Sequence, residues 1–138
     1  MKRTIGRVPD APFAELHLAD APTVTAPDGS DVHVLLARSG GSMAVFVLEP
    51  GHVSAAVAHR TVDEIWFVLD GRGEMWRRNG REERVVALSA GLCLTIPAGT
   101  AFQFRVAADE RLRVVAVTMP PWPGPDEATP VAGREEWR

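Results

Sequence analysis

The sequence predicts a single-domain, all-β protein that folds as a sandwich or a barrel. Three observations lead to this prediction. About nine short segments with apolar alternation follow one another at near-even spacing, and turns rich in Gly and Pro separate them. No stretch shows a helical period over more than about two turns. With 138 residues, the chain is long enough to bury a sizeable core in one domain.

The first element in chain order is an extended arm over residues 1–30, which is expected to contain one or two edge strands. Its one apolar alternation is Phe13–Leu18, and Pro27-Asp28-Gly29-Ser30 is a strong turn signal at its end. The barrel is then expected over residues 31–119. Its strands are predicted at 32–38, 42–48, 54–59, 64–69, 74–78, 83–88, 92–96, 102–106 and 112–119.

The turns between these strands are the clearest local signals. Asn79-Gly80 is the best two-residue hairpin signal, and it predicts that 74–78 pairs with 83–88. The arginines around this hairpin, together with Glu82 and Glu83, are expected to form a solvated tip; they are Arg77, Arg78, Arg81 and Arg84. The tail 120–138 carries five prolines, which remove hydrogen-bond donors. It is therefore predicted to be a tether without a regular strand, with Trp122 and Trp137 as the residues able to pack back on the surface.

Composition narrows the possible functions. The formal net charge is −3 and the arginines are scattered among acidic residues, so nucleic acid is not an expected partner. Cys93 is the one cysteine, which excludes an internal disulfide and fits a reducing cytoplasm. Because it lies in an apolar strand, Cys93 is expected to be buried. The basic start of the chain has no apolar run behind it, so neither a signal peptide nor a membrane partner is expected, and the predicted location is the cytoplasm.

The stretch from Gly51 to Gly71 carries the candidate chemistry. Alternate side chains of a strand share a face, so Val57 and His59 point the same way. Glu64 and Trp66 likewise share one face of the next strand. If these faces line the inside of a barrel, an imidazole and a carboxylate meet in largely apolar surroundings.

Two spacings in the chain resemble a known family. Gly51 is followed by five residues, then Val57-Ala58-His59, and after four more residues by Glu64, with Gly71 six residues further on. Gly91 is followed by five residues, then Pro97-Ala98-Gly99, and after two more residues by Phe102. These patterns resemble the two motifs of the cupins, in the small single-domain form with one conserved barrel. The resemblance implies a jelly-roll β-barrel, also called a double-stranded β-helix.

The departures from the family pattern concern the metal. Cupins that bind a metal generally use three histidines and a glutamate, and the matching positions here are Val57, His59, Glu64 and Phe102. Since Val and Phe cannot ligate a metal, no metal and no other cofactor is expected. The alternative is a metal-dependent isomerase or dioxygenase in which His59 and Glu64, with ligands that the sequence does not identify, hold Zn, Fe, Mn or Ni.

The expected function is the binding of a small, partly apolar molecule inside the barrel. His59 and Glu64 are the polar groups that would orient it, and either one is also a candidate acid or base; Val57, Trp66, Phe102 and Phe104 would line the cavity. Two alternatives stay open. The aromatic residues can simply fill the barrel as core, and His59 and Glu64 can be a relic pair that hydrogen-bond to each other. Whether the protein is an enzyme is left open.

The outward face of the segment 64–69 predicts self-association. Ile65, Phe67 and Leu69 are strongly apolar, and such a face requires a cover. A homodimer is therefore expected, with the arm before residue 31 available for exchange.

Overall fold

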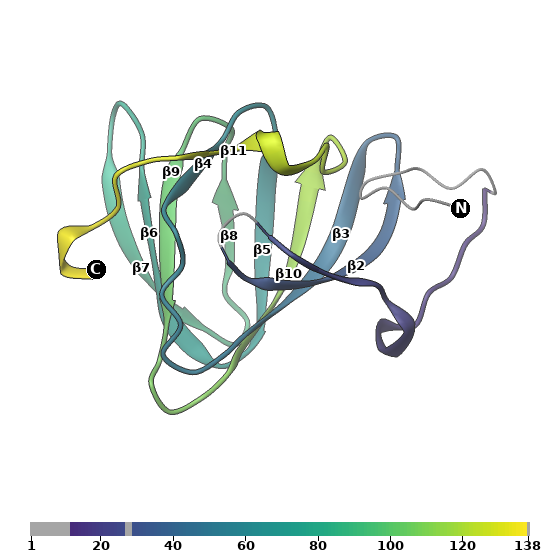
Figure 1. Cartoon of the computed structure of the whole chain (residues 1–138), viewed down its shortest axis with the longest axis horizontal. Helices are drawn as coiled ribbons and strands as arrows, with labels where there is room; N and C mark the ends of the chain where they lie inside the picture. Colours follow the sequence, from purple (N-terminus) through teal and green to yellow (C-terminus); the bar gives the residue numbers. More distant parts are fainter. Residues whose placement is uncertain (1–11, 27–28, 138) are drawn as a thin grey trace.

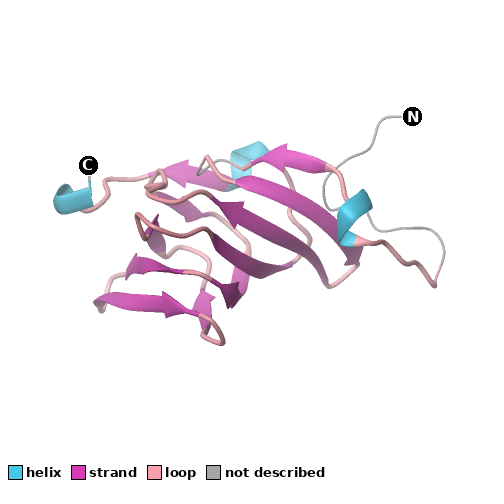
Figure 2. Ribbon diagram, turned by 90° about the horizontal axis from the view of Figure 1, so that it is seen from below, coloured by secondary structure: helices cyan, strands magenta, loops and turns pink. Residues whose placement is uncertain are grey.

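A computed structural model describes residues 12–26 and 29–137 of the chain (Figure 1). These residues form two antiparallel β-sheets with only three short 3-10 helices, and the ribbon seen from below shows the strands stacked in two layers (Figure 2). The predicted jelly-roll β-barrel is confirmed. No helix in the described residues is both long and apolar enough to span a membrane.

The larger sheet has six strands. The last long strand of the chain lies in its interior, between two strands that come earlier in the sequence. In sheet order the strands are β1 (Thr23–Thr25), β2 (Asp31–Arg38), β3 (Gly41–Leu48), β10 (Leu112–Met119), β5 (Asp63–Asp70) and β8 (Cys93–Ile96). The smaller sheet has five strands, in the order β11 (Ala128–Pro130), β4 (Val57–His59), β9 (Ala101–Val106), β6 (Arg72–Arg78) and β7 (Glu83–Ser89). The 3-10 helices are η1 (Leu18–Asp20), η2 (Pro125–Glu127) and η3 (Glu135–Trp137).

The hydrophobic core lies between the two sheets because the long strands alternate buried and exposed residues. In β5 every second residue from Glu64 to Val68 is buried, and β10 alternates in the same way. The largest fully buried side chains include Trp66, Phe104 and Met75. Each fully buried side chain of this kind contributes roughly 1.5–3 kcal/mol through removal of apolar surface from water.

The strands β2 to β10 correspond to the nine predicted segments, but β4 is shorter than expected. A strand was predicted over 54–59, and the ladder begins only at Val57. The reason lies at Ser54, whose Oγ accepts the backbone N–H of Phe104 at 2.9 Å and whose backbone oxygen accepts from the Gln103 side chain at 3.0 Å. These side-chain bonds replace the regular strand pairing.

The arm contains an edge strand as predicted, whereas the tail differs from the prediction. Phe13–Leu18 does not form a strand; the edge strand of the arm is instead β1, which pairs with β2. The proline-rich tail was expected to hold no regular strand, yet β11 pairs with β4 at the edge of the smaller sheet. An edge strand tolerates this sequence because Pro130 ends the strand, and an edge position needs no further donor.

Two predictions for single side chains are wrong. Cys93 was expected to be buried, but it is exposed, because it is on the outer face of β8. Arg77 was expected in a solvated hairpin tip together with Arg78, Arg81 and Arg84. The other three are exposed, whereas Arg77 is half-buried, on the same face of β6 as the core residue Met75.

The turn that ends β5 requires a glycine. Gly71 has φ +94°, and a Cβ at this position would lie 2.2 Å from the backbone oxygen of Arg111. Only glycine satisfies both the positive φ and the close approach of the neighbouring chain. The motif glycine therefore fixes where β5 turns into β6.

Candidate functional site

His59 and Glu64 meet inside the barrel as the sequence predicted. His59 is the last residue of β4 and Glu64 the second of β5, with the turn Arg60–Val62 between them. Both are buried, each about 4% exposed. The Nδ1 atom of His59 lies 3.4 Å from Oε1 of Glu64.

This contact between Nδ1 of His59 and the Glu64 carboxylate is not a hydrogen bond. No hydrogen-bond partner reaches the buried Nδ1 atom of His59 within the described part of the chain. The other carboxylate oxygen of Glu64, Oε2, accepts the indole N–H of Trp66 at 2.7 Å. The relic-pair alternative required a hydrogen bond between the two groups, and none forms at Nδ1, so an unsatisfied ring nitrogen remains beside a carboxylate.

Two aromatic rings enclose the imidazole of His59. Phe102 from β9 lies edge-on to it, with ring centroids 5.1 Å apart, and Trp122 from the tail does the same at 5.0 Å. The backbone N–H of Trp122 donates to Ser42 Oγ at 3.1 Å, which ties the tail to β3. Burial in these surroundings lowers the pKa of His59 from 6.5 to about 4, so the imidazole is neutral at pH 7.

A second carboxylate, Glu127, supports the turn that carries His59. It accepts hydrogen bonds from the backbone N–H of Thr61 at 2.7 Å, the Thr61 hydroxyl at 2.6 Å and the backbone N–H of Val62 at 3.0 Å. Burial raises the pKa of this carboxyl, but the three hydrogen bonds outweigh burial, and the pKa is lowered overall. Its negative charge acts on His59 in turn and raises the pKa of the imidazole, against the larger effect of burial.

The predicted lining residues pack together as core. Val57, Trp66, Phe102 and Phe104 are all buried and belong to one hydrophobic cluster. The rings of Trp66 and Phe104 lie 5.2 Å apart in an edge-to-face arrangement. Phe102 touches His59 directly, whereas Trp66 meets the site through its indole N–H. Trp66 and Phe104 are therefore core residues that pack next to the His59–Glu64 pair.

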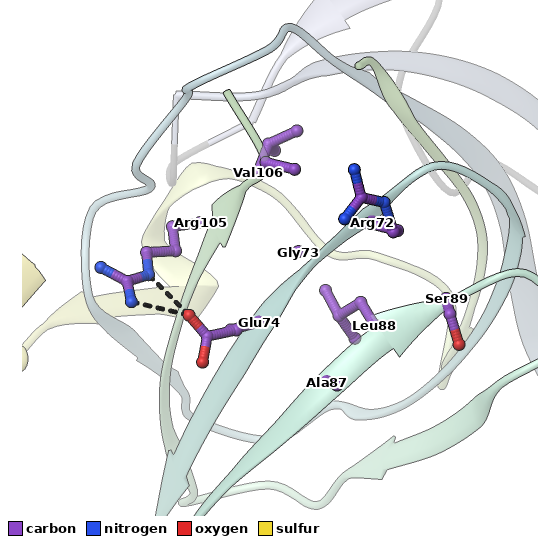
Figure 3. A pocket seen from close by; sticks show the side chains of 9 residues that line it. Arg72, Gly73, Glu74, Ala87, Leu88, Ser89, Arg105 and Val106 are labelled. Carbon is purple, nitrogen blue, oxygen red and sulfur yellow. Dashed lines mark hydrogen bonds and ion pairs between the residues drawn. The ribbon is translucent and has the colours of Figure 1, made fainter. Parts of the chain in front are cut away.

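A surface hollow of about 310 Å³ lies at the opposite end of the barrel (Figure 3). Leu88 and Val106 form apolar walls, and Gly73 also lines the hollow. Arg105 forms an ion pair with Glu74 at its edge, with a shortest distance of 2.7 Å. Because Val106 is the last residue of β9 and Phe102, which contacts His59, is its second residue, this hollow is remote from His59.

The donor atoms at the site do not fit a catalytic metal centre. A catalytic zinc usually has three protein ligands. His59 and Glu64 supply two donors, while Val57 and Phe102 occupy the other two positions of the family pattern with carbon side chains. In the described residues, no group of three or more His, Cys, Asp or Glu side chains is placed to hold a metal ion.

A comparison with protein families matches residues 44–118, more than half of the chain, to the family described as "Cupin domain". The chain belongs to this family. The match spans β3 to β10, so it contains both His59 and Glu64. No curated protein matches this cupin.

Solved structures of other proteins share the fold. A variant of Streptomyces PAC13 with uridine has a TM-score of 0.72 at 15% identity, covering 91% of this cupin and 96% of the other chain. An uncharacterised protein with a double-stranded β-helix domain from Klebsiella pneumoniae has a TM-score of 0.66 at 20% identity, covering 88% and 99%. KdgF from Halomonas sp. has a TM-score of 0.59 at 19% identity, covering 69% and 82%. At these identities the similarity shows the fold alone.

Proposed function

We propose that this cupin binds a small, partly apolar molecule at the His59–Glu64 end of its barrel, without a complete metal site. The observation that carries the proposal is the buried Nδ1 atom of His59, which has no hydrogen-bond partner in the described residues. Leaving a buried polar atom unpaired costs roughly 1–3 kcal/mol. A ligand that hydrogen-bonds to this nitrogen would recover that free energy.

The residues around His59 favour a ligand that is partly apolar and carries a neutral polar group. The rings of Phe102 and Trp122 offer apolar contact on the imidazole, and aromatic walls with few polar groups are typical of small-molecule sites. A neutral imidazole can either donate or accept a hydrogen bond, which suits a hydroxyl, amide or carbonyl group. Pac13, a protein of similar fold, is described as a nucleoside dehydratase, which makes a small organic ligand reasonable for such a barrel.

Calorimetric titration tests the proposal with two neutral probes, 4-hydroxybenzamide and uridine. The wild-type chain is expected to bind at least one of them, and His59→Phe should abolish binding because it keeps the ring but removes the nitrogen. His33→Phe is the matched control, since His33 lies on β2 and contacts Thr23 instead of the site. Equal binding by the wild type and His59→Phe would contradict a site at His59.

Elemental analysis of the purified, untagged chain tests the metal-free part of the proposal. The expected metal content is far below one equivalent per chain, with no uptake after soaking in Zn, Fe, Mn or Ni salts. Close to one equivalent, lost in His59→Ala, would show that a third donor completes a metal site and would favour a metal-dependent enzyme.

A further inference from the structure

Arg77 brings a guanidinium to the inner face of the barrel. It shares a face of β6 with the core residue Met75. Its Nη1 donates to the backbone oxygen of Thr95 on β8, in the other sheet, at 2.7 Å. The side chain of Arg77 therefore connects the two sheets at the end of the barrel where β9 begins.

Arg77 lies in one row of the smaller sheet with the two replaced ligand positions of the cupin pattern. Register partners across the smaller sheet run from Val57 to Phe102, then to Arg77 and Arg84. Neighbouring strands are about 4.8 Å apart, so Arg77 follows Phe102 directly. The ring of Phe102 contacts His59. Phe102 is therefore a ring neighbour of His59 and a register partner of Arg77.

Arg77 forms no ion pair with a carboxylate among the residues that the structure describes, although the charge of Glu82 acts on it from further away. Arg84, its neighbour in the row, is paired with Glu82 at 2.7 Å. The Nε atom of Arg77 is buried and has no hydrogen-bond partner there. Burial, followed by the charge of Arg84, lowers the pKa of Arg77, although Glu82 partly opposes this. A bound anion would supply both the missing acceptor and the missing charge.

We propose that the ligand of this site is a small carboxylate with an apolar or aromatic body, bound with its carboxylate on Arg77 and its body on Phe102. A neutral polar group at the other end would meet His59. The inference rests on the proposed function and specifies its ligand class. A guanidinium presents paired N–H groups that match a carboxylate. One unpaired arginine favours a single negative charge, so a phosphate ester is the less suitable anion.

The test compares probes that differ in charge but hardly in shape, by calorimetric titration at low salt. The probes are 4-hydroxybenzoate, its neutral amide 4-hydroxybenzamide, and phenyl phosphate. The wild-type chain should bind the acid at least about tenfold more tightly than the amide, as expected for a charged hydrogen bond. Arg77→Gln should bring this ratio close to one, and Arg77→Lys should restore part of it. Arg78→Gln is the matched control, because Arg78 lies over the Trp76 ring on the outer face.

Each outcome has a distinct meaning. Binding of the amide in a His59-dependent way, without preference for the acid, would overturn the carboxylate and leave the proposed function standing. An acid preference that survives in Arg77→Gln would overturn the role of Arg77. Tighter binding of phenyl phosphate than of the acid would overturn the ligand class, and failure of all three probes to bind would count against both proposals. Thermal unfolding of each variant shows whether the fold is retained.

Discussion

The buried imidazole of His59 makes the stability of this cupin depend on pH. Its pKa is about 4 in the folded chain and 6.5 for an exposed histidine, so between these values the unfolded chain binds a proton that the folded chain does not. The part of the stability that depends on the neutral His59 is therefore fully present above about pH 6.5, and it is lost as the pH is lowered towards 4. At pH 5 the free energy of unfolding should be about 2 kcal/mol lower than at pH 7 because of this group.

Urea unfolding at pH 7 and pH 5 measures this difference. His59→Phe should lose most of the decrease, because the titrating group is gone, whereas His33→Phe should keep it. A decrease of equal size in the wild type and in His59→Phe would mean that other groups cause the pH dependence. Titration of the His59 ring by NMR gives its pKa directly.

Glu127 should affect both the stability of the chain and the pKa of His59. Glu127→Gln weakens the three hydrogen bonds from Thr61 and Val62, at a cost of roughly 1–3 kcal/mol in the free energy of unfolding. It also removes the negative charge that raises the pKa of His59, so that pKa should fall further. NMR titration in this variant and in Glu136→Gln, at a carboxylate exposed on η3, measures the effect. An unchanged or higher pKa of His59 would contradict this electrostatic contact.

The turns between strands differ in how strictly they require glycine. Gly71 and Gly91 have φ of +94° and +91°, but a Cβ would meet backbone only at Gly71. Gly91→Ala should therefore cost about 1–2 kcal/mol, the price of a left-handed conformation. Gly71→Ala should cost a further 1–3 kcal/mol or so for the overlap with Arg111. Urea unfolding compares the two variants, and equal costs would show that the chain near Arg111 moves away freely.

The sequence predicts the strands and the His59–Glu64 pair because both depend on local alternation and spacing. Position within a strand decides which side chains share a face, and this rule placed His59 and Glu64 together correctly. The same rule applied to Met75 and Arg77 would have turned Arg77 inward, but its position near a polar hairpin suggested exposure instead. This error arose from treating the four arginines as one group.

The parts of the site that come from the tail could not be predicted. Trp122 and Glu127 reach His59 only because β11 pairs with β4, and that pairing joins segments about seventy positions apart in a region of broken strand pattern. No local signal marks Glu127 as a partner of Thr61. Contacts formed by such long-range pairing follow from the whole fold.

The two outer faces of the barrel are covered to different extents. On the smaller sheet, Trp137 from the tail packs against Trp76, and the backbone N–H of Arg134 donates to the Gln103 side chain at 3.0 Å. On the larger sheet, the outer side chains of β5 remain exposed, with Phe67 at 43%. Ile65 and Leu69 flank it on the same face and are exposed to a similar extent. A contiguous apolar surface of this kind favours association.

We therefore propose a homodimer formed through the outer face of β5, to be measured by sedimentation equilibrium. The wild-type chain should sediment as a dimer, and Phe67→Lys should sediment as a monomer because burying an unpaired charge in an apolar interface is unfavourable. Val85→Lys is the matched control, since Val85 is 38% exposed on β7 in the other sheet. If His59 binds its ligand within one barrel, Phe67→Lys should also bind 4-hydroxybenzamide as tightly as the wild type. A monomeric wild type, or a dimer that Phe67→Lys leaves intact, would contradict an interface at β5.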